Sequence, residues 1–213
     1  MEEQNWFSTL SRNLSLQASP NHEFHASPYA IRSINVQALD RFGPRIGFLK
    51  ISAVVSNNEG STLPGAVFLR GASVGMLVIL QPDDLVEGSE EERYVLLTVQ
   101  PRIAAGGLGF VELPAGMVDQ GSFKGAAAKE IEEELGMTIP EDELINLTEL
   151  AMPESHEAEK EKVQSAVYPS AGGCDEYIPL FMHVRRVPRK TLGEWEGKLT
   201  GLRDQGEKVC CMP

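Results

Sequence analysis

The sequence predicts an α/β fold in which helices flank a mixed β-sheet, and two observations support it. Several apolar or alternating segments of strand length follow one another along the chain. Between them lies one helical segment, residues 123–135, which is followed by Gly136, a residue type that commonly ends helices. Many strands around one central helix indicate a sheet covered by helices.

The first part of the chain predicts a unit of antiparallel strands. Residues 1–29 are polar and contain proline breakers, so we expect a polar N-terminal extension there. Residues 31–39 and 45–55 have the apolar pattern of strands and are separated by a turn. These strands belong to a predicted N-terminal unit at residues 30–66.

The remaining residues, 67–213, are predicted to form the main domain. Residues 67–80 have the pattern of one or two strands, and the nearly continuous apolar run 74–80 predicts burial on both faces. Further elements are expected as follows: a charged loop at 83–93, strands at 94–100, 110–115, 144–152 and 177–187, and a polar surface insertion at 155–164.

The composition excludes some classes of function. The 213 residues carry a formal net charge of −12, which argues against nucleic-acid binding because such a surface needs a basic stripe. No apolar run approaches the ~20 residues of a membrane-spanning helix. Three cysteines, two of them adjacent, suit a reducing compartment, and the acidic start lacks the apolar core of a signal peptide. We therefore expect a cytoplasmic protein.

The central helix carries an acidic stripe. Glu130, Glu133 and Glu134 fall within an arc of ~100° on a helix. The adjacent arc predicts the core face and holds Ala127, Ala128, Ile131 and Leu135. Such a run is usually a solvated face, but a strand and a tight glycine turn at 110–116 precede it. Because carboxylates on one stripe repel each other, a hard divalent cation is their natural partner.

The segment 116–137 resembles the box of the Nudix hydrolase family, a glycine, then a glutamate, then REUxEExGU, in which U is aliphatic. The matching residues are Gly116, Lys129, Glu130, Ile131, Glu133, Glu134, Gly136 and Met137. Three features depart from the box: the spacing from Gly116 to Lys129 is one residue shorter, Ser122 or a neighbour stands in place of the first glutamate, and Lys129 replaces arginine. A lysine lacks the planar fork of arginine, so we expect it to hold Glu133 less firmly.

Further stretches are similar to the ADP-sugar diphosphatase branch of the family, especially to plant-type ADP-glucose and ADP-ribose pyrophosphatases. They lie at residues 42–50, 64–71, 112–117, 168–176 and 201–207. The resemblance implies an α/β/α sandwich with a mixed sheet. It also implies a homodimer, since the N-terminal strands of related enzymes often cross to a partner subunit. Related chains continue into a long C-terminal helix, which we expect to be missing here.

The resemblance implies Mg²⁺-dependent hydrolysis of the diphosphate bond of ADP-sugars, such as ADP-ribose and ADP-glucose, to AMP and a sugar phosphate. Mg²⁺, or Mn²⁺ in its place, would be held by Glu130, Glu134 and the backbone carbonyl of Ala115. Glu133 would bridge metals or share that role. An acidic protein needs such cations to hold a diphosphate.

Residues outside the box complete the implied site. Glu176 lies on a small, glycine-rich loop and is the candidate general base. Arg70 and Arg102 are candidate contacts to phosphate or adenylate, and Glu112 could accept a hydrogen bond from the nucleotide. The structural alternative is that Glu176 only begins the next strand and that the other three residues form ion pairs in the sheet.

Two other functions stay open. The first is hydrolysis of UDP-glucose or another nucleoside-diphosphate sugar, because specificity rests on pocket shape. The second is a nucleotide-binding or interaction module with impaired turnover. The short box, Lys129 and the missing tail favour this module, whereas the retained glutamates, including Glu176, oppose it.

Overall fold

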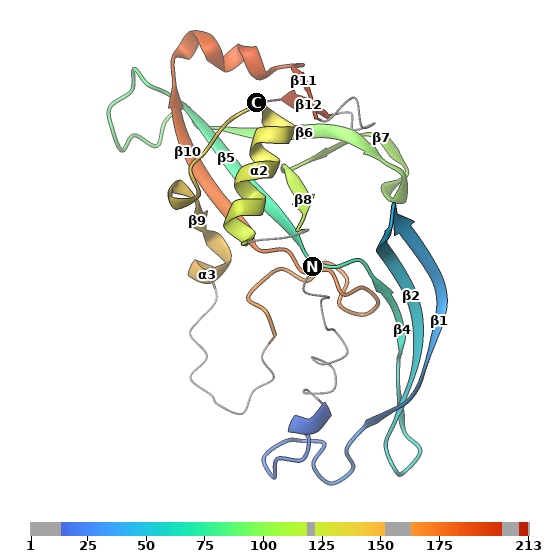
Figure 1. Cartoon of the computed structure of the whole chain (residues 1–213). Coiled ribbons are helices and arrows are strands. Elements are labelled where there is room, and N and C mark those ends of the chain that lie inside the picture. Colours follow the sequence, from blue (N-terminus) through green and yellow to red (C-terminus); the bar gives the residue numbers. More distant parts are fainter. Residues whose placement is uncertain (1–13, 119–121, 152–162, 202–208, 213) are drawn as a thin grey trace. The chain divides into compact units, whose positions relative to one another are not determined.

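The computed structural model describes residues 14–118, 122–151, 163–201 and 209–212 (Figure 1). These residues divide into two compact units. Unit 1 contains residues 14–72 and 163–177, and unit 2 contains the remainder. The chain passes from unit 1 to unit 2 between Ala72 and Ser73. The boundary predicted between residues 66 and 67 from the sequence stays a prediction.

Unit 1 is built on a small antiparallel sheet. Its strands are β1 (Ala30–Phe42), β2 (Arg45–Ser56), β3 (Thr62–Leu63) and β4 (Ala66–Leu69). Strand β2 pairs with each of the other three. The two strands and the turn predicted at its start are confirmed.

The two long strands of unit 1 are buried to different degrees. Ile51, Ala53 and Val55 of β2 alternate along the strand and are buried. Strand β1 is exposed from Arg32 to its end, and this exposed stretch includes Ile34, Val36, Leu39 and Phe42. A long, exposed edge strand with apolar side chains is a surface on which another chain can pair.

Unit 2 contains a mixed sheet. Its strands are β5 (Ser73–Pro82), β6 (Tyr94–Arg102), β7 (Gly107–Glu112), β8 (Ala115–Met117), β9 (Ile145–Asn146), β10 (Leu180–Val187), β11 (Leu199–Thr200) and β12 (Val209–Met212). The order is β11-β12-β6-β5-β10-β9, with β7 beside β6 and β8 beside β5. Strands β5 and β10 are parallel, and the other described pairs are antiparallel. The predicted α/β class with a mixed sheet is confirmed.

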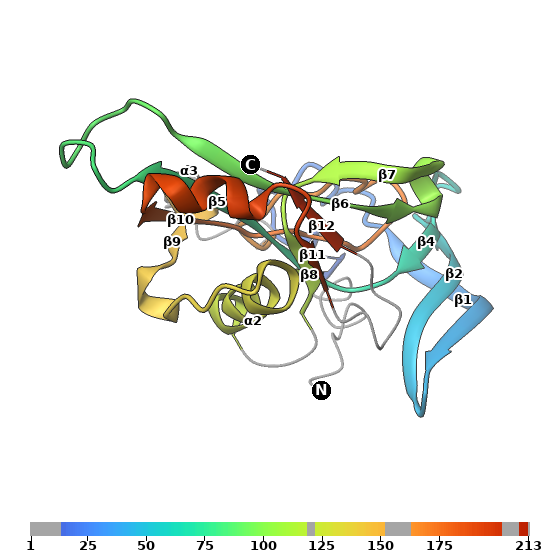
Figure 2. The same ribbon diagram turned by 90° about the horizontal axis from the view of Figure 1, so that it is seen from above.

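Helices of unit 2 pack on or beside this sheet. They are η1 (Ile103–Ala105), α2 (Phe123–Leu135), η2 (Glu141–Glu143), α3 (Leu147–Ala151) and η3 (Arg189–Trp195). Figure 2 shows α2 on one face of the sheet, where it contacts β5 and β8. Its predicted core face, represented by Ala127, Ile131 and Leu135, is fully buried against β5. The helix ends as predicted, because Gly136 adopts φ +65°, which costs glycine little.

Two predicted strands differ from the structure. The strand expected at 110–115 is divided, because Pro114 has no N–H for a ladder; β7 pairs with β6, and β8 pairs with β5. The prediction of a strand at 144–152 is wrong for most of this range, because only Ile145–Asn146 form a strand and Leu147–Ala151 form helix α3. There the side chain of Asn146 accepts a hydrogen bond from the N–H of Glu149 at 3.1 Å and starts helix α3.

Some predictions shift only in their limits. The apolar run at 67–80 forms two strands, β4 and β5, separated at Gly71, which has φ +86°. The last predicted strand starts later, at Leu180. Most of the insertion expected at 155–164 lies outside the described residues.

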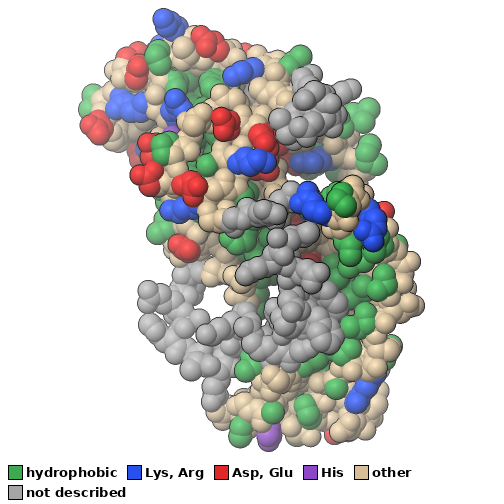
Figure 3. Space-filling model, in the orientation of Figure 1, with side chains coloured by type: hydrophobic (Ala, Val, Ile, Leu, Met, Phe, Trp, Pro, Cys, Tyr) green, Lys and Arg blue, Asp and Glu red, His purple; other side chains and the backbone are tan. Residues whose placement is uncertain are grey.

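No helix among the described residues is long and apolar enough to span a membrane. On the surface of unit 2 drawn in the upper part of Figure 3, acidic and basic side chains are interspersed.

Candidate active site

Glu130 of helix α2 lies against the backbone of Gly116 in strand β8. A Cβ atom added to Gly116 would lie 1.8 Å from the Cδ atom of Glu130. Any other residue at this position would therefore displace the carboxylate. The sequence match at Gly116 thus has a local physical reason, since only glycine leaves room for the Glu130 carboxylate over strand β8.

Glu134 is buried one turn further along the same face of α2. Its side chain is 1% exposed, and its Oε1 atom accepts a hydrogen bond from Nε2 of Gln100 at 3.1 Å. Its Oε2 atom accepts a second from the N–H of Ala115, also at 3.1 Å. Because a buried carboxylate is costly without partners, these donors fix its orientation.

Glu133 lies nearer the surface and pairs with Lys129. The Nζ atom of Lys129 is 3.1 Å from Oε1 of Glu133, and the lysine side chain is 68% exposed. Such i,i+4 pairs on a helix surface contribute only about 0.3–0.5 kcal/mol. Glu132 is exposed, as expected for the acidic residue outside the stripe.

Polar groups hold both ends of α2. At its start, Ser122 accepts a hydrogen bond from the N–H of Gly125 at 2.9 Å and donates one to Glu141 at 3.3 Å. Ser122 therefore caps the helix near the place where the box has its first glutamate. At the other end, Lys198 and Thr200 donate to the last carbonyl oxygens of the helix.

The predicted metal ligands on α2 have the chemistry that a hard cation requires. Glu130, Glu133, Glu134 and the carbonyl of Ala115 offer only oxygen atoms, which Mg²⁺ and Mn²⁺ prefer. The absence of a side chain at Gly116 also leaves the Glu130 carboxylate directly over strand β8. These residues fit a divalent cation. Within the ranges that the structure describes, however, no three His, Cys, Asp or Glu side chains form a metal-binding group, so the ligand set stays a prediction.

Arg102 and Glu112, the predicted nucleotide contacts of unit 2, are paired with each other. Nε and Nη2 of Arg102 lie 2.7 and 2.6 Å from Oε1 of Glu112. The two residues stand on the neighbouring strands β6 and β7. The pair matches the alternative stated from the sequence, in which these residues form an ion pair in the sheet. Its presence does not test whether Arg102 and Glu112 contact a nucleotide.

Unit 1 brings Arg70 and Glu176 together. Nη1 of Arg70 is 3.1 Å from Oε1 of Glu176, and both side chains are partly buried. Asp175, the residue before Glu176, makes a second connection. Its Oδ1 atom accepts hydrogen bonds from the N–H groups of Arg70 and Gly71 at 2.7 and 3.1 Å. The candidate base is thus held near a candidate phosphate ligand.

Three residues with clear roles were not predicted as contributors: Gln100, Ser122 and Asp175. Gln100 follows the alternation of Leu96 and Thr98, which are buried on the same side of β6, so strand periodicity could have indicated it. A serine directly before a helix is a recognised cap signal. Nothing local indicates the contact of Asp175, because its partner Arg70 is 105 residues away in the sequence.

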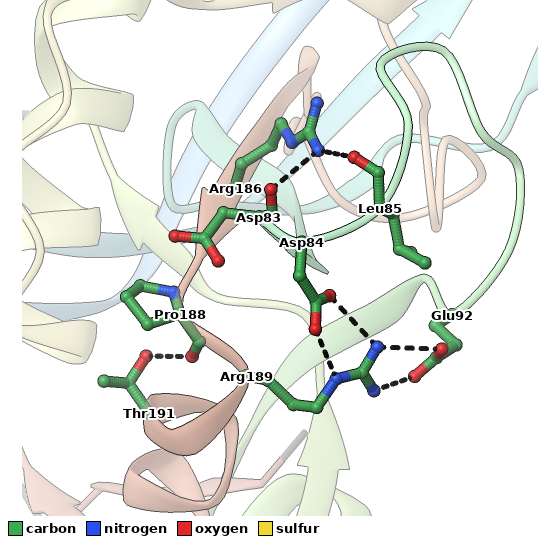
Figure 4. A network of polar contacts seen from close by, with 8 residues as sticks. All are labelled: Asp83, Asp84, Leu85, Glu92, Arg186, Pro188, Arg189 and Thr191. Carbon is green, nitrogen blue, oxygen red and sulfur yellow. Dashed lines mark hydrogen bonds and ion pairs between the residues drawn. The ribbon is translucent and has the colours of Figure 1, made fainter.

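Two further features of unit 2 contain none of the predicted site residues. An open cavity of about 300 Å³ lies beyond the C-terminus of α2 and is lined by residues that include Thr138, Arg185 and Trp195. An exposed ion-pair network connects Arg189 with Asp84 and Glu92 (Figure 4). Hydrogen bonds from Arg189 hold the pKa of both carboxyl groups below their ordinary values.

Comparisons with known proteins agree with the box. A family model described as the NUDIX domain matches residues 70–209. The chain is 37% identical over 182 residues to Nudix hydrolase 14, chloroplastic, of Arabidopsis thaliana. That alignment covers 84% of this chain and 54% of the relative, so the chain spans about half of its length.

A solved structure, described as the crystal structure of an ADP compounds hydrolase, has a similar fold. Its TM-score with this chain is 0.52 at 15% sequence identity. The match covers 86% of this chain and 76% of the solved one. At this identity the likeness supports the fold alone, and it agrees with the architecture predicted from the sequence.

Proposed function

Because this chain belongs to the Nudix family, we propose that it hydrolyses the diphosphate bond of ADP-sugars, such as ADP-ribose and ADP-glucose, in the presence of Mg²⁺. The products are AMP and a sugar phosphate. The names of the two similar proteins, a Nudix hydrolase and an ADP compounds hydrolase, support this choice of reaction and substrate.

The observation that carries the proposal is the position of two α2 carboxylates against strand β8. Glu130 lies over Gly116, and Glu134 is oriented by the N–H of Ala115. Two carboxylates one helical turn apart are therefore directed by the same three-residue strand, β8. A solvated helix face would not require a glycine opposite one carboxylate or bury the other.

In the proposal, Glu130, Glu133, Glu134 and the carbonyl of Ala115 hold Mg²⁺ or Mn²⁺. Bound there, the cation neutralises phosphate oxygens and makes a water molecule more acidic. Gln100 and Ala115 keep Glu134 in one orientation, which reduces the rearrangement needed when the site is loaded.

The remaining roles follow the family resemblance. Arg70 and Arg102 bind phosphate oxygens, because a guanidinium fork suits a diphosphate. Glu176 accepts a proton from the attacking water. The water oxygen forms a bond to phosphorus, the bond from that phosphorus to the bridging oxygen breaks, and the sugar phosphate or AMP leaves. Since Arg70 contacts Glu176, substrate phosphate competes for this arginine.

Nucleotide binding without turnover is the second candidate function. Ser122 caps α2 instead of supplying a box glutamate, and the exposed Lys129 makes an ion pair with Glu133 at the position of the box arginine. Both differences replace box residues expected to support metal binding, and both leave the fold of helix α2 intact.

One assay separates these functions. The purified full chain is incubated with ADP-ribose, ADP-glucose or UDP-glucose, with and without Mg²⁺, and AMP or UMP is measured by chromatography. Metal-dependent release of AMP supports the proposal, and release of UMP alone identifies the UDP-sugar alternative. Binding of ADP-ribose in calorimetry without product in any reaction supports the binding module and contradicts the proposed reaction.

We further propose that the chain forms a homodimer through β1. This strand is exposed along most of its length and carries exposed apolar side chains at Ile34, Val36 and Leu39. Pairing of the β1 strands of two subunits would satisfy the unpaired backbone groups of this edge and remove part of the strand from water. Sedimentation of the wild type and of Val36→Lys tests this: the variant is expected to be monomeric, and a monomeric wild type contradicts the dimer.

The cytoplasmic location remains a prediction from the sequence. The Arabidopsis relative is named as chloroplastic, which is a property of that protein. Microscopy of the full chain fused to a fluorescent protein at its C-terminus tests the location, and fluorescence confined to an organelle contradicts it.

A further inference from the structure

The glycine-rich loop of unit 1 is fastened to strand β4 by its backbone. The N–H of Phe68 donates to the carbonyl of Gly173 at 2.8 Å, and the N–H of Asp175 donates to the carbonyl of Phe68 at 3.2 Å. These bonds form a short parallel bridge between Phe68 and Cys174. The loop therefore runs beside β4 for a few residues, in register with it.

The side chain of Asp175 continues this attachment beyond the end of β4. Its Oδ1 atom accepts from the N–H of Arg70 at 2.7 Å and from the N–H of Gly71 at 3.1 Å. At Gly71 the backbone turns away with φ +86°. A carboxylate oxygen that binds two successive N–H groups forms charge-assisted bonds, which are stronger than neutral ones.

These bonds fix two side chains that the proposed reaction uses. Arg70 donates its backbone N–H to Asp175, and Glu176 is the next residue after Asp175. The Arg70 guanidinium lies 3.1 Å from the Glu176 carboxylate. Both side chains are partly buried, and the backbone N–H of Arg70 is bonded to the side chain of the residue before Glu176.

We propose that Asp175 is a positioning residue, which holds the loop at 170–176 on β4 so that Glu176 and Arg70 keep their places for the reaction. This inference rests on the proposed function, because it takes Glu176 as the general base and Arg70 as a phosphate ligand. In this role Asp175 acts through Glu176 and Arg70 rather than on the substrate itself.

Kinetics of four variants test the proposal: Asp175→Ala, Asp175→Asn, Glu176→Gln and the double variant Asp175→Ala/Glu176→Gln. Asp175→Ala should lower kcat by roughly tenfold to a hundredfold, because small displacements of a catalytic group have effects of this size. Asparagine retains an oxygen at the same position, so Asp175→Asn should lose less. In the double variant, the alanine should cost less than it costs in the wild type, because only its effect on Arg70 then remains.

Hydrogen exchange of the same proteins gives a readout independent of turnover. The peptide that contains residues 68–71 should exchange faster in Asp175→Ala than in the wild type and in Asp142→Ala, which changes an exposed aspartate of η2. Unchanged exchange overturns the proposal. It is also overturned if Asp175→Ala lowers kcat equally with and without Glu176, or if Asp175→Asn is as impaired as Asp175→Ala.

Failure of the proposed function has a different signature. If the wild type hydrolyses none of the three nucleotide sugars, the catalytic part of the inference falls with the function. Faster exchange in Asp175→Ala would then still support Asp175 as the residue that holds the loop.

Discussion

Unit 2 contains two groups of carboxylates that differ in their surroundings. On α2, Glu134 is buried and accepts hydrogen bonds from neutral donors, and Glu130 lies over a glycine. In the exposed network, Asp84 and Glu92 are both paired with the guanidinium of Arg189. The donors to Glu134 are a side-chain amide and a backbone N–H, whereas Asp84 and Glu92 share one guanidinium, whose bonds to them are charge-assisted.

This difference shows why the number of acidic residues is a poor guide to function. The Arg189 network joins the loop between β5 and β6 to η3 and resembles an ordinary surface ion-pair network (Figure 4). In the α2 group, Glu130 and Glu134 instead lie against the backbone of strand β8. Changes to the α2 group should therefore alter catalysis, and changes to the network should alter only stability.

The largest effect is expected for Glu130→Gln. A bound metal ion stabilises the charge of the transition state by several kcal/mol. Loss of the proposed ligand Glu130 should therefore lower kcat/KM for ADP-ribose by roughly a thousandfold. Glu132→Gln, on the exposed side of the same helix, is the control and should be near wild type. Equal activity of the two variants, measured by AMP release at saturating Mg²⁺, would show that the acidic stripe has no role in turnover.

A smaller loss is expected for Gly116→Ala. The added Cβ would meet the Glu130 carboxylate, the end of a flexible side chain that can move, so the fold should survive. Displacement of this ligand should cost roughly tenfold to a hundredfold in kcat/KM, with little change in Tm. Gly193→Ala is the matched control, since its Cβ would meet no atom within 4 Å. A Gly116→Ala variant with the kcat/KM of the wild type would contradict the placement of Glu130.

The third prediction concerns the buried carboxylate. In Glu134→Gln, one of the two N–H donors would face an amide NH₂ group, which cannot accept its bond. We expect the free energy of unfolding to fall by about 1–3 kcal/mol. Urea unfolding in EDTA measures this without a contribution from bound metal. Glu132→Gln again serves as the control, and an unchanged midpoint for Glu134→Gln would mean that Gln100 and Ala115 do not stabilise the charged form.

Helix α2 was predictable because its signals are local. Its core face repeats with helical periodicity, and Gly136 follows its last turn. The division of the strand at Pro114 could also have been predicted from the missing N–H. Helix α3 was missed because five residues are too few to show a helical apolar pattern, and because its start depends on the side chain of Asn146.

The contacts within the site were less predictable because they join distant parts of the chain. Gln100 and Glu134 are 34 residues apart, and Arg70 and Asp175 are 105 residues apart. Residue type and spacing suggested the roles of the glutamates in the box. They could not show that Arg102 would meet Glu112 or that Arg70 would meet Glu176, because both pairs depend on how the chain folds.

The smallest effect is expected for Arg189→Gln in the exposed network. Hydrogen bonds from Arg189 lower the pKa of Asp84 and of Glu92, so the folded state favours their charged forms. The network's contribution is therefore complete above the unfolded carboxyl pKa, about 4, and is lost as the pH falls through the lower folded values. The urea midpoints of the wild type and the variant should differ at pH 7 and converge below about pH 4.

High salt and the variant Arg93→Gln are two controls for the prediction on Arg189→Gln. Because the groups are exposed, the difference between wild type and Arg189→Gln should also shrink in 1 M salt, where the Debye length is about 3 Å. Arg93→Gln, which removes an arginine paired with the single carboxylate of Glu90, should have a smaller effect at pH 7. AMP release should stay unchanged in both variants. If Arg189→Gln lost much of its activity while its urea midpoint stayed unaltered, the comparison between α2 and the exposed network would be wrong. The network would then have the catalytic role proposed for the carboxylates of α2.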